Sequence, residues 1–223
     1  MRCDNCKMKE FDYSHVQSYK FAEVMKPFLK FLAKTLMKIE YDGLENIPEK
    51  GGYIVAANHV SAPDPTYILT EIKKPVHYMN KKEHFKNPVM RWIYTRFNSF
   101  PVNRGQSDRK AIDYSIKVIE AGNVLGIFPE GTRSKDYKPK QARTGVALIA
   151  RETKADVLPV ALYTSDRAKA FSKLTVRFGP LIPYEALGFG EGGKSEELKA
   201  AADIIMKEIV ELWKQGHGEK KNT

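Results

Sequence analysis

Cysteine is nearly absent from this sequence of 223 residues, which has only Cys3 and Cys6, spaced as one C-x-x-C pair. We therefore expect no disulfide framework, and a single pair without further cysteine or histidine nearby predicts no tetrahedral zinc site. Uninterrupted apolar runs of 18 residues or more are also lacking, so we predict no transmembrane helix. Asp4, Glu10 and Asp12 interrupt the apolar core that a cleavable signal peptide needs, so none is expected. Neither G-x-S-x-G nor H-E-x-x-H occurs, which removes the serine-hydrolase and zinc-protease interpretations.

Acidic residues are outnumbered, because 37 Lys and Arg face 27 Asp and Glu, a net charge of +10. The excess is uneven: residues 73–110 hold ten basic side chains against two acidic ones, and residues 133–154 hold seven against two. The positive electrostatic field favours an anionic partner. Four classes fit this description: nucleic acid, anionic lipid, a phosphorylated substrate and an acidic protein. Composition does not choose among these classes.

Short apolar runs alternate with longer helical patterns from residue 53 onward, and no Pro/Gly/Ser-rich linker divides the chain. The expected strands are Tyr53 to Ala57, Val76 to Met79, Phe100 to Val102, Val124 to Phe128, Val157 to Tyr163 and Leu174 to Phe178. The expected helices are Pro65 to Ile72, Pro88 to Phe97, Ser107 to Ala121, Arg143 to Glu152 and Ser195 to about Gln215. This alternation predicts an α/β domain over residues 43–223, with a single mostly parallel sheet flanked by helices and with sites at the carboxyl edge of the strands.

Residues 15–40 combine apolar and basic side chains at helical spacing, and Pro27 is expected to kink this helix or to start a second one. Such a basic amphipathic segment either lies in a bilayer interface or packs its apolar face on the domain, and both interpretations stay open. We assign residues 1–42 as an N-terminal amphipathic helical segment for membrane docking. The expected docking side chains are Lys26, Phe28, Lys30, Phe31 and Lys34.

His59 and Asp64 stand five positions apart, directly after the apolar run at 53–57. An imidazole accepts a proton near neutral pH, and a carboxylate on its other nitrogen fixes the tautomer and stabilises the imidazolium. The pair is therefore a candidate general base with its orienting group. A second interpretation is helix capping, in which Asp64 is the N-cap before Pro65, or Ser61 and Asp64 act together. These residues alone leave catalysis and capping both open.

A second polar segment, Phe128 to Ser134, follows another predicted buried strand. Gly131 permits a positive φ and a close approach of backbone amides to a ligand, and Arg133 can grip a phosphate with two hydrogen bonds. Glu130 can orient Arg133 or hold a substrate hydroxyl. The segment is thus a candidate anion site, and an ordinary Glu-Gly turn with solvated charges is the alternative.

Two further arginines are placed where an anion would be favoured. Arg104 follows the predicted strand that ends at Val102. Arg143 precedes a predicted helix, and phosphate is stabilised at helix N-termini.

Four blocks in a fixed order resemble those of the bacterial 1-acylglycerol-3-phosphate acyltransferases, a family of glycerolipid acyltransferases. Residues 59–64 match its His-x4-Asp motif, and residues 128–134 match its Phe-Pro-Glu-Gly-Thr-Arg-Ser block. Residues 100–105 resemble the second block, with Arg104 as the phosphate-binding arginine, and residues 157–162 resemble the fourth. The resemblance spans about residues 51–162. Many members have an N-terminal transmembrane helix, where only the amphipathic segment is visible here.

The resemblance implies an enzyme that transfers an acyl chain from a thioester to the sn-2 hydroxyl of lysophosphatidate, giving phosphatidic acid. It implies His59 and Asp64 as the catalytic pair. The residues that it implies for the acceptor phosphate are Arg104, Glu130, Gly131, Arg133 and Arg143. No metal or cofactor is expected, and the co-substrate is acyl-CoA or acyl-acyl-carrier-protein. The expected partner is an anionic membrane surface rather than nucleic acid, and the expected location is peripheral or monotopic on the cytoplasmic face.

Other functions stay open. Glycerol 3-phosphate or another lysophospholipid is an alternative acceptor, and a non-catalytic basic module that binds membrane or nucleic acid is an alternative of another class. Residues 188–195 also fit the P-loop pattern G-x4-G-K-S. We do not assign nucleotide hydrolysis to them, because Pro180 and Pro183 argue against the buried strand that must precede a P-loop. Ser195 is expected instead to cap the last helix.

Overall fold

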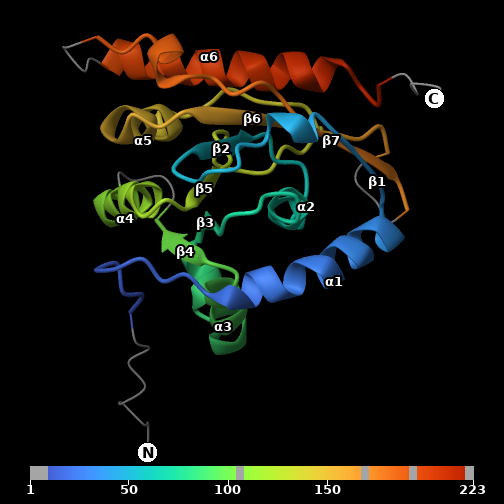
Figure 1. Ribbon diagram of the computed structural model, residues 1–223, viewed down its shortest axis with the longest axis horizontal. Coiled ribbons are helices and arrows are strands. Elements are labelled where there is room, and N and C mark those ends of the chain that lie inside the picture. Colours follow the sequence, from blue (N-terminus) through green and yellow to red (C-terminus); the bar gives the residue numbers. More distant parts are fainter. Residues whose placement is uncertain (1–9, 104–107, 167–170, 191–194, 219–223) are drawn as a thin grey trace, which may run out of the picture.

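A seven-stranded sheet forms the centre of the computed structural model, which describes residues 10–103, 108–166, 171–190 and 195–218 (Figure 1). The strands are β1 (Lys38–Asp42), β2 (Ile54–Ala57), β3 (Val76–Lys81), β4 (Ser99–Val102), β5 (Val124–Ile127), β6 (Val157–Tyr163) and β7 (Lys173–Phe178). Their order across the sheet is β1-β7-β6-β2-β5-β3-β4. All neighbouring pairs are parallel except β6 and β7. The predicted mostly parallel α/β architecture is confirmed.

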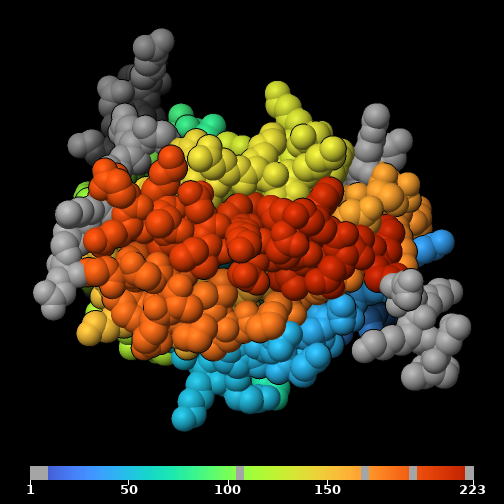
Figure 2. Space-filling model, turned by 90° about the horizontal axis from the view of Figure 1, so that it is seen from above, coloured from blue at the N-terminus to red at the C-terminus, as the bar shows by residue number. Residues whose placement is uncertain are grey.

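Helices cover both faces of the sheet. They are α1 (Lys20–Leu36), α2 (Asp64–Leu69), α3 (Pro88–Arg96), α4 (Arg109–Glu120), α5 (Gly145–Thr153) and α6 (Ser195–Lys214), with short 3-10 turns η1 (Leu44–Asn46), η2 (Lys82–Phe85) and η3 (Tyr184–Leu187). The helices α4, α5 and α6 pack on one face, and α1 and α2 pack on the other. Figure 2 shows α6 stretched across the face seen from above, and in Figure 1 α1 runs along the opposite side.

The central strand β2 explains why the sheet needs both layers. Ile54 and Ala56 belong to the core beneath α4, α5 and α6, while Val55 and Ala57 belong to the core beneath α1 and α2. All four side chains are buried. Because a strand alternates its side chains between two faces, a fully apolar strand is stable only when both faces are covered, and each buried Val or Ile contributes about 1.5–3 kcal/mol.

The N-terminal segment differs from its prediction in two respects. A single helix, α1, contains Pro27 and ends at Leu36, so no second helix starts at the proline. Residues 38–42 form strand β1, which pairs in parallel with β7 from Lys38 opposite Lys173 to Asp42 opposite Arg177. Five residues of the predicted docking segment 1–42 are therefore part of the sheet.

Most other element boundaries lie within a few residues of prediction, and β6 spans Val157–Tyr163 as expected. The described part of α6 begins at Ser195, and the residues before it lie outside the described ranges, so the capping role of Ser195 stays a prediction. Cys3, Cys6 and the glycine-rich residues 191–194 lie outside the described residues. Within the described ranges, no helix combines the length and apolarity required to cross a bilayer.

Candidate active site

The two motif segments meet at the carboxyl edge of the sheet. β2 and β5 are parallel neighbours, with Ile54 opposite Leu125 and Ala56 opposite Ile127, so the loops that follow them leave from the same edge. The backbone N–H of His59 donates to Glu130 Oε1 at 3.0 Å, and the N–H of Ser134 donates to the His59 carbonyl at 2.7 Å. Segments separated by about 70 residues in the sequence therefore form one hydrogen-bonded unit.

His59 and Asp64 are in direct contact. His59 Nδ1 lies 2.8 Å from Asp64 Oδ2, and the two side chains are 12% and 0% exposed. With Nδ1–H donating to the carboxylate, Nε2 is left as the proton acceptor of the neutral ring. The arrangement is that of a general base and its orienting group.

The carboxylate of Asp64 also organises the loop before it. Its Oδ2 accepts hydrogen bonds from the backbone N–H of Val60 at 2.7 Å and of Ser61 at 2.8 Å, and its Oδ1 accepts one from the Ser61 hydroxyl. Asp64 is not the N-cap of α2, since the helix begins at Asp64 itself and its N-cap, Pro63, contributes no side-chain hydrogen bond. Ser61 and Asp64 do act together, but their hydrogen bonds lie in the loop before the helix. The carboxylate of Asp64 therefore accepts hydrogen bonds from the loop that carries His59, and not from the first N–H groups of α2.

An aromatic ring fixes the imidazole from one side. The rings of His59 and Phe128 are stacked, with centroids 4.1 Å apart and planes inclined by 20°. Phe128 in turn stacks on Tyr78 of β3, at 5.9 Å and 18°. We did not assign Phe128 to the site from the sequence, although its place at the head of the Phe-Pro-Glu-Gly-Thr-Arg-Ser segment was a signal.

Glu130 is buried beside the histidine, with an exposed fraction of 6%. Burial raises its pKa to about 7, and the hydrogen bond from the His59 N–H offsets only part of that rise. Its Oε2 has no hydrogen-bond partner among the described residues. A carboxyl group that is partly protonated near neutral pH and has a free oxygen can donate to or accept from a substrate oxygen. No hydrogen bond or ion pair joins Glu130 to Arg133 within the described residues, so the predicted orienting role finds no support.

The predicted arginines fall in three different places. Arg143 and Gly131 line the same cavity as His59, whereas the exposed Arg133 lines neither that cavity nor the larger one beside it. Arg104 lies outside the described residues. Gly131 has a φ of 71°, and a Cβ there would come within 2.9 Å of Arg143 Nε. Residue 131 must therefore be a glycine, because any side chain at this position would displace Arg143.

The cavity at His59 has a volume of about 330 Å³ and is mainly apolar. Ala111 and Ile112 of α4 form one wall, and Val146 and Ile149 of α5 form another. Its lining provides space for an apolar group next to the imidazole.

Asn58 joins the end of β2 to β6. Its Nδ2 donates to the Leu162 carbonyl at 2.9 Å, and its Oδ1 accepts from the Leu162 N–H at 2.8 Å. The side chain is fully buried and replaces a pair of ladder hydrogen bonds just before His59. No periodic pattern of residues indicates that Asn58 joins the two strands.

Comparison with known proteins identifies relatives of this chain. The family model described as "Acyltransferase" matches residues 38–163. The chain is 29% identical over 170 residues to 1-acyl-sn-glycerol-3-phosphate acyltransferase of Bacillus subtilis, covering 75% of this chain and 84% of the relative. It is 30% identical over 191 residues to the enzyme of the same name from Streptococcus pneumoniae, covering 81% and 69%.

A solved structure has the same fold. The crystal structure of the 1-acyl-sn-glycerophosphate (LPA) acyltransferase PlsC from Thermotoga maritima superposes with a TM-score of 0.67 at 27% identity, covering 85% of this chain and 78% of that one. The matched family region includes the His59–Asp64 pair, the Phe128 to Ser134 segment and strand β6. The chain belongs to the acyltransferase family.

Proposed function

We propose that this acyltransferase transfers an acyl chain from a thioester to the sn-2 hydroxyl of 1-acylglycerol 3-phosphate, with His59 as general base. The observation that carries the proposal is the 2.8 Å contact between His59 Nδ1 and Asp64 Oδ2 at the mouth of an apolar cavity. The names of the curated relatives support lysophosphatidate as the acceptor.

In the proposed reaction, His59 Nε2 removes the proton of the acceptor hydroxyl while its oxygen attacks the thioester carbonyl. The carbonyl π electrons move to oxygen, and they return as the C–S bond breaks. The proton on His59 then passes to the departing thiolate, so that an ester and a free thiol are formed and the base is regenerated. Asp64 stabilises the imidazolium between these steps, and such general-base assistance typically contributes about 10²- to 10⁴-fold.

We assign the acyl chain of the donor to the cavity between α4 and α5. Its walls are mainly apolar side chains, and His59 is one of the residues that line it. An acyl chain that enters this cavity brings its carbonyl carbon to the imidazole, so binding and orientation are achieved together.

We assign the acceptor phosphate to Arg143, which lines the cavity, with the exposed Arg133 as a second cation. The phosphate-binding role of Arg104 stays a prediction from the sequence, because this residue lies outside the described ranges. Arg143 lies two residues before α5, so the phosphate would also face a helix N-terminus. Glu130 Oε2 is the candidate partner of a substrate hydroxyl. Arg143→Ala is then expected to raise the KM for the acceptor more than Arg133→Ala does.

We further propose that the outer face of α1 docks the enzyme on an anionic bilayer. Val24, Phe28 and Phe31 are 75%, 57% and 68% exposed, and Val89 and Trp92 of α3 extend the apolar surface with 64% and 53%. Phe21 of α1 contacts Trp92 edge to face at 5.8 Å, so the two helices form one surface, along the lower side of Figure 1. This surface is the docking face.

Not all of the predicted docking lysines point outward. Lys26 Nζ donates to Glu23 and to the Ile72 carbonyl, both at 2.6 Å, and its side chain is 13% exposed. Lys30 pairs with the buried Glu71 at 2.7 Å. We therefore remove Lys26 and Lys30 from the docking proposal, and keep the exposed Lys34 with Phe28 and Phe31.

The decisive experiment is thiol release. Acyl-CoA and acyl-acyl-carrier-protein are each mixed with lysophosphatidate, glycerol 3-phosphate or another lysophospholipid in the presence of detergent micelles. The proposal expects fast, His59-dependent thiol release with lysophosphatidate. Preference for another acceptor overturns the assigned substrate, and no release with any pair supports the non-catalytic alternative.

A further inference from the structure

A second, larger cavity adjoins the one that contains His59. Its volume is about 700 Å³, and Asn103 and Asp108 line both cavities. The other lining residues are Glu10, Phe11, Tyr13, Lys82, Glu83, Phe85, Lys86, Arg91, Pro101, Arg109 and Lys110. They come from the stretch before α1, from η2 and the residue after it, from β4, and from the first turns of α3 and α4. We refer to this space as the outer cavity.

The outer cavity has an excess of positive charge that the protein does not neutralise. In the described part of the chain, the side chains of Lys82, Lys86, Arg91 and Lys110 form no hydrogen bond or ion pair. Arg109, the fifth cation, is paired with Asp113 at 2.9 Å. Cations that converge on a concave surface without partners form a site for a polyanion.

The carboxylates that line the outer cavity cancel only part of this field, since three of them face five Lys and Arg side chains. Asp108 accepts hydrogen bonds from the backbone N–H and the side-chain amide of Asn103, at 2.8 and 2.9 Å, and also caps α4. Glu83 forms an ion pair at 3.5 Å with Lys81, a residue that does not line the cavity. Glu10 is the only other acidic residue among the lining residues that the structure describes.

One wall of the outer cavity is aromatic. Phe11 and Tyr13 lie edge to face at 4.9 Å, and Phe85, which is 6% exposed, also lines the cavity. Planar rings beside unpaired cations match a ligand that combines a flat base with phosphate groups.

We propose that the outer cavity binds the 3′-phosphorylated ADP end of a coenzyme A thioester. This inference rests on the proposed function, in which the acyl chain occupies the apolar cavity at His59. The pantetheine arm then passes Asn103 and Asp108, the residues common to both cavities. The concave shape favours a nucleotide over the convex surface of a folded carrier protein, so the occupant is coenzyme A.

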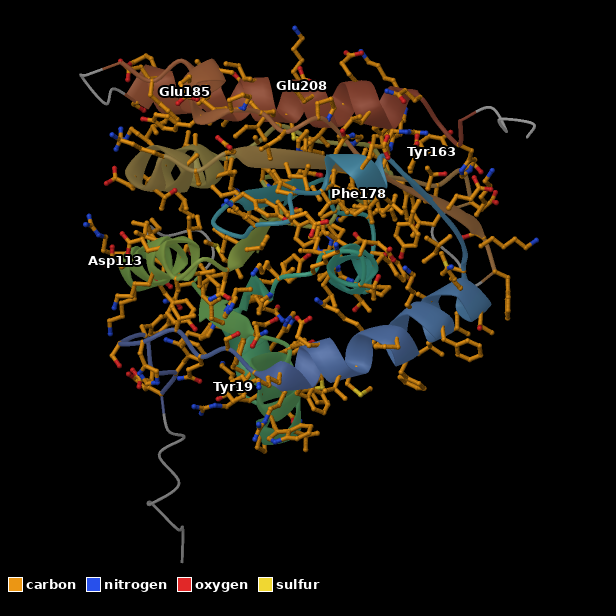
Figure 3. All side chains as sticks on the ribbon, viewed as in Figure 1. Tyr19, Asp113, Tyr163, Phe178, Glu185 and Glu208 are labelled. Carbon is orange, nitrogen blue, oxygen red and sulfur yellow. The ribbon has the colours of Figure 1, made fainter. Side chains whose placement is uncertain are left out.

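The kinetic test compares acyl-CoA with acyl-dephospho-CoA, which lacks only the 3′-phosphate. The variant Arg91→Ala,Lys110→Ala should raise the KM for acyl-CoA about tenfold and should reduce the preference for acyl-CoA over its dephospho form. The KM for lysophosphatidate should not change. The control variant Lys207→Ala,Lys214→Ala removes the same charge from α6, the helix that carries Glu208 on the opposite side of the molecule (Figure 3). It should leave both KM values unchanged.

The outcomes separate the possible occupants. Equal KM values for acyl-CoA in the wild type and in Arg91→Ala,Lys110→Ala overturn the proposal. A loss confined to acyl-acyl-carrier-protein also overturns it and identifies a carrier-protein surface. A raised KM for lysophosphatidate, with that for acyl-CoA unchanged, assigns the outer cavity to the acceptor instead.

A binding measurement makes the inference independent of turnover. Adenosine 3′,5′-bisphosphate is titrated calorimetrically into the wild type, Arg91→Ala,Lys110→Ala and Lys207→Ala,Lys214→Ala. Binding should weaken about tenfold only in the first variant, and should weaken with added salt. Equal binding by all three overturns the proposal. Failure of the wild type to release thiol with every substrate pair contradicts the proposed function, and this titration then decides the inference by itself.

Discussion

At the level of single residues, Asp64 both orients the imidazole of His59 and stabilises the loop around it. Substitutions of Asp64 and of His59 should therefore have different effects. The carboxylate holds the imidazole and also accepts the N–H groups of Val60 and Ser61. We expect His59→Ala to lower turnover about 10²- to 10⁴-fold with little loss of stability. Asp64→Ala should lower turnover and also the free energy of unfolding, by about 1–3 kcal/mol, because buried N–H groups lose their acceptor.

Thiol release at saturating substrates and urea unfolding measure the two effects. Ser61→Ala is the control, since it removes one hydroxyl contact to Asp64 and leaves both backbone hydrogen bonds in place. If Asp64→Ala unfolds at the same urea concentration as the wild type, other contacts hold the loop.

Glu130 makes stability depend on pH. Burial raises its pKa from an ordinary 4.5 to about 7. The folded state therefore binds the proton more tightly, so this contribution to stability is complete below about pH 4.5 and is lost as the pH rises through about 7. Relative to the wild type, Glu130→Gln should gain up to about 3 kcal/mol in the free energy of unfolding between these limits.

Urea unfolding of both proteins at pH 4.5 and pH 8 checks this prediction. Glu45→Gln alters an exposed carboxylate on η1 and serves as the control. A difference between Glu130→Gln and the wild type that does not change with pH would show that Glu130 is charged to the same extent when folded and unfolded.

At the level of elements, Asn58 determines where β2 delivers His59. Its amide makes two hydrogen bonds to the backbone of Leu162 in β6. Asn58→Ala leaves that N–H and C=O without partners and should cost about 2–4 kcal/mol in unfolding free energy. Turnover of the folded fraction should fall as well, because His59 is the next residue. Full turnover in a destabilised Asn58→Ala would show that the histidine loop is positioned independently of β6.

The helix α1 offers a direct test of docking. Phe28→Ser,Phe31→Ser removes two exposed rings and should reduce binding to anionic vesicles at least about tenfold, because each ring loses apolar burial in the bilayer interface. Leu44→Ser, on η1, removes an apolar side chain that is 43% exposed and should have no effect. Sedimentation with vesicles measures both. Equal losses in the two variants would place the docking face elsewhere.

The sequence predicted the buried strands and the main helices because their apolar patterns extend over several residues. It did not predict β1, whose residues alternate between exposed and partly buried and include Lys38, Glu40 and Asp42. Such an edge strand has only Ile39 and Tyr41 to indicate it, and the stronger helical pattern of residues 20–36 masked that signal. The capping of α2 was misassigned because Asp64 faces back toward the histidine loop, which depends on tertiary contacts.

At the level of the whole molecule, the order of the motifs predicted which segments form the site, but not their spatial arrangement. Parallel pairing of β2 with β5 brings His59 and Glu130 together, as expected from their positions after strands. Arg143 lines the His59 cavity and Arg133 does not. This difference depends on the course of a long loop whose sequence has no periodic pattern. Both cavities combine residues far apart in the sequence, so neither was predictable.

The sheet also joins the two predicted segments of the chain. β1 pairs with β7, and the buried Arg177 donates to Asp42 at 2.9 Å and to the Leu212 carbonyl at 2.8 Å. A chain of residues 43–223 therefore loses an edge strand and leaves Arg177 without its carboxylate. We expect its melting temperature to fall by about 10 °C or more, because β7 loses its ladder hydrogen bonds to β1 and the core loses the partly buried Ile39 and Tyr41.

Asp42→Asn separates the strand from the ion pair. It keeps β1 and alters only a carboxylate that is 62% exposed, so the loss should be about 1 kcal/mol or less. Thermal unfolding followed by circular dichroism compares the truncated chain, Asp42→Asn and the full chain. A truncated chain that melts with the full chain would make residue 42 a true domain boundary. A melting temperature well below that of Asp42→Asn would make β1 an integral strand, so that docking must be tested by point substitutions on α1 rather than by deleting the segment.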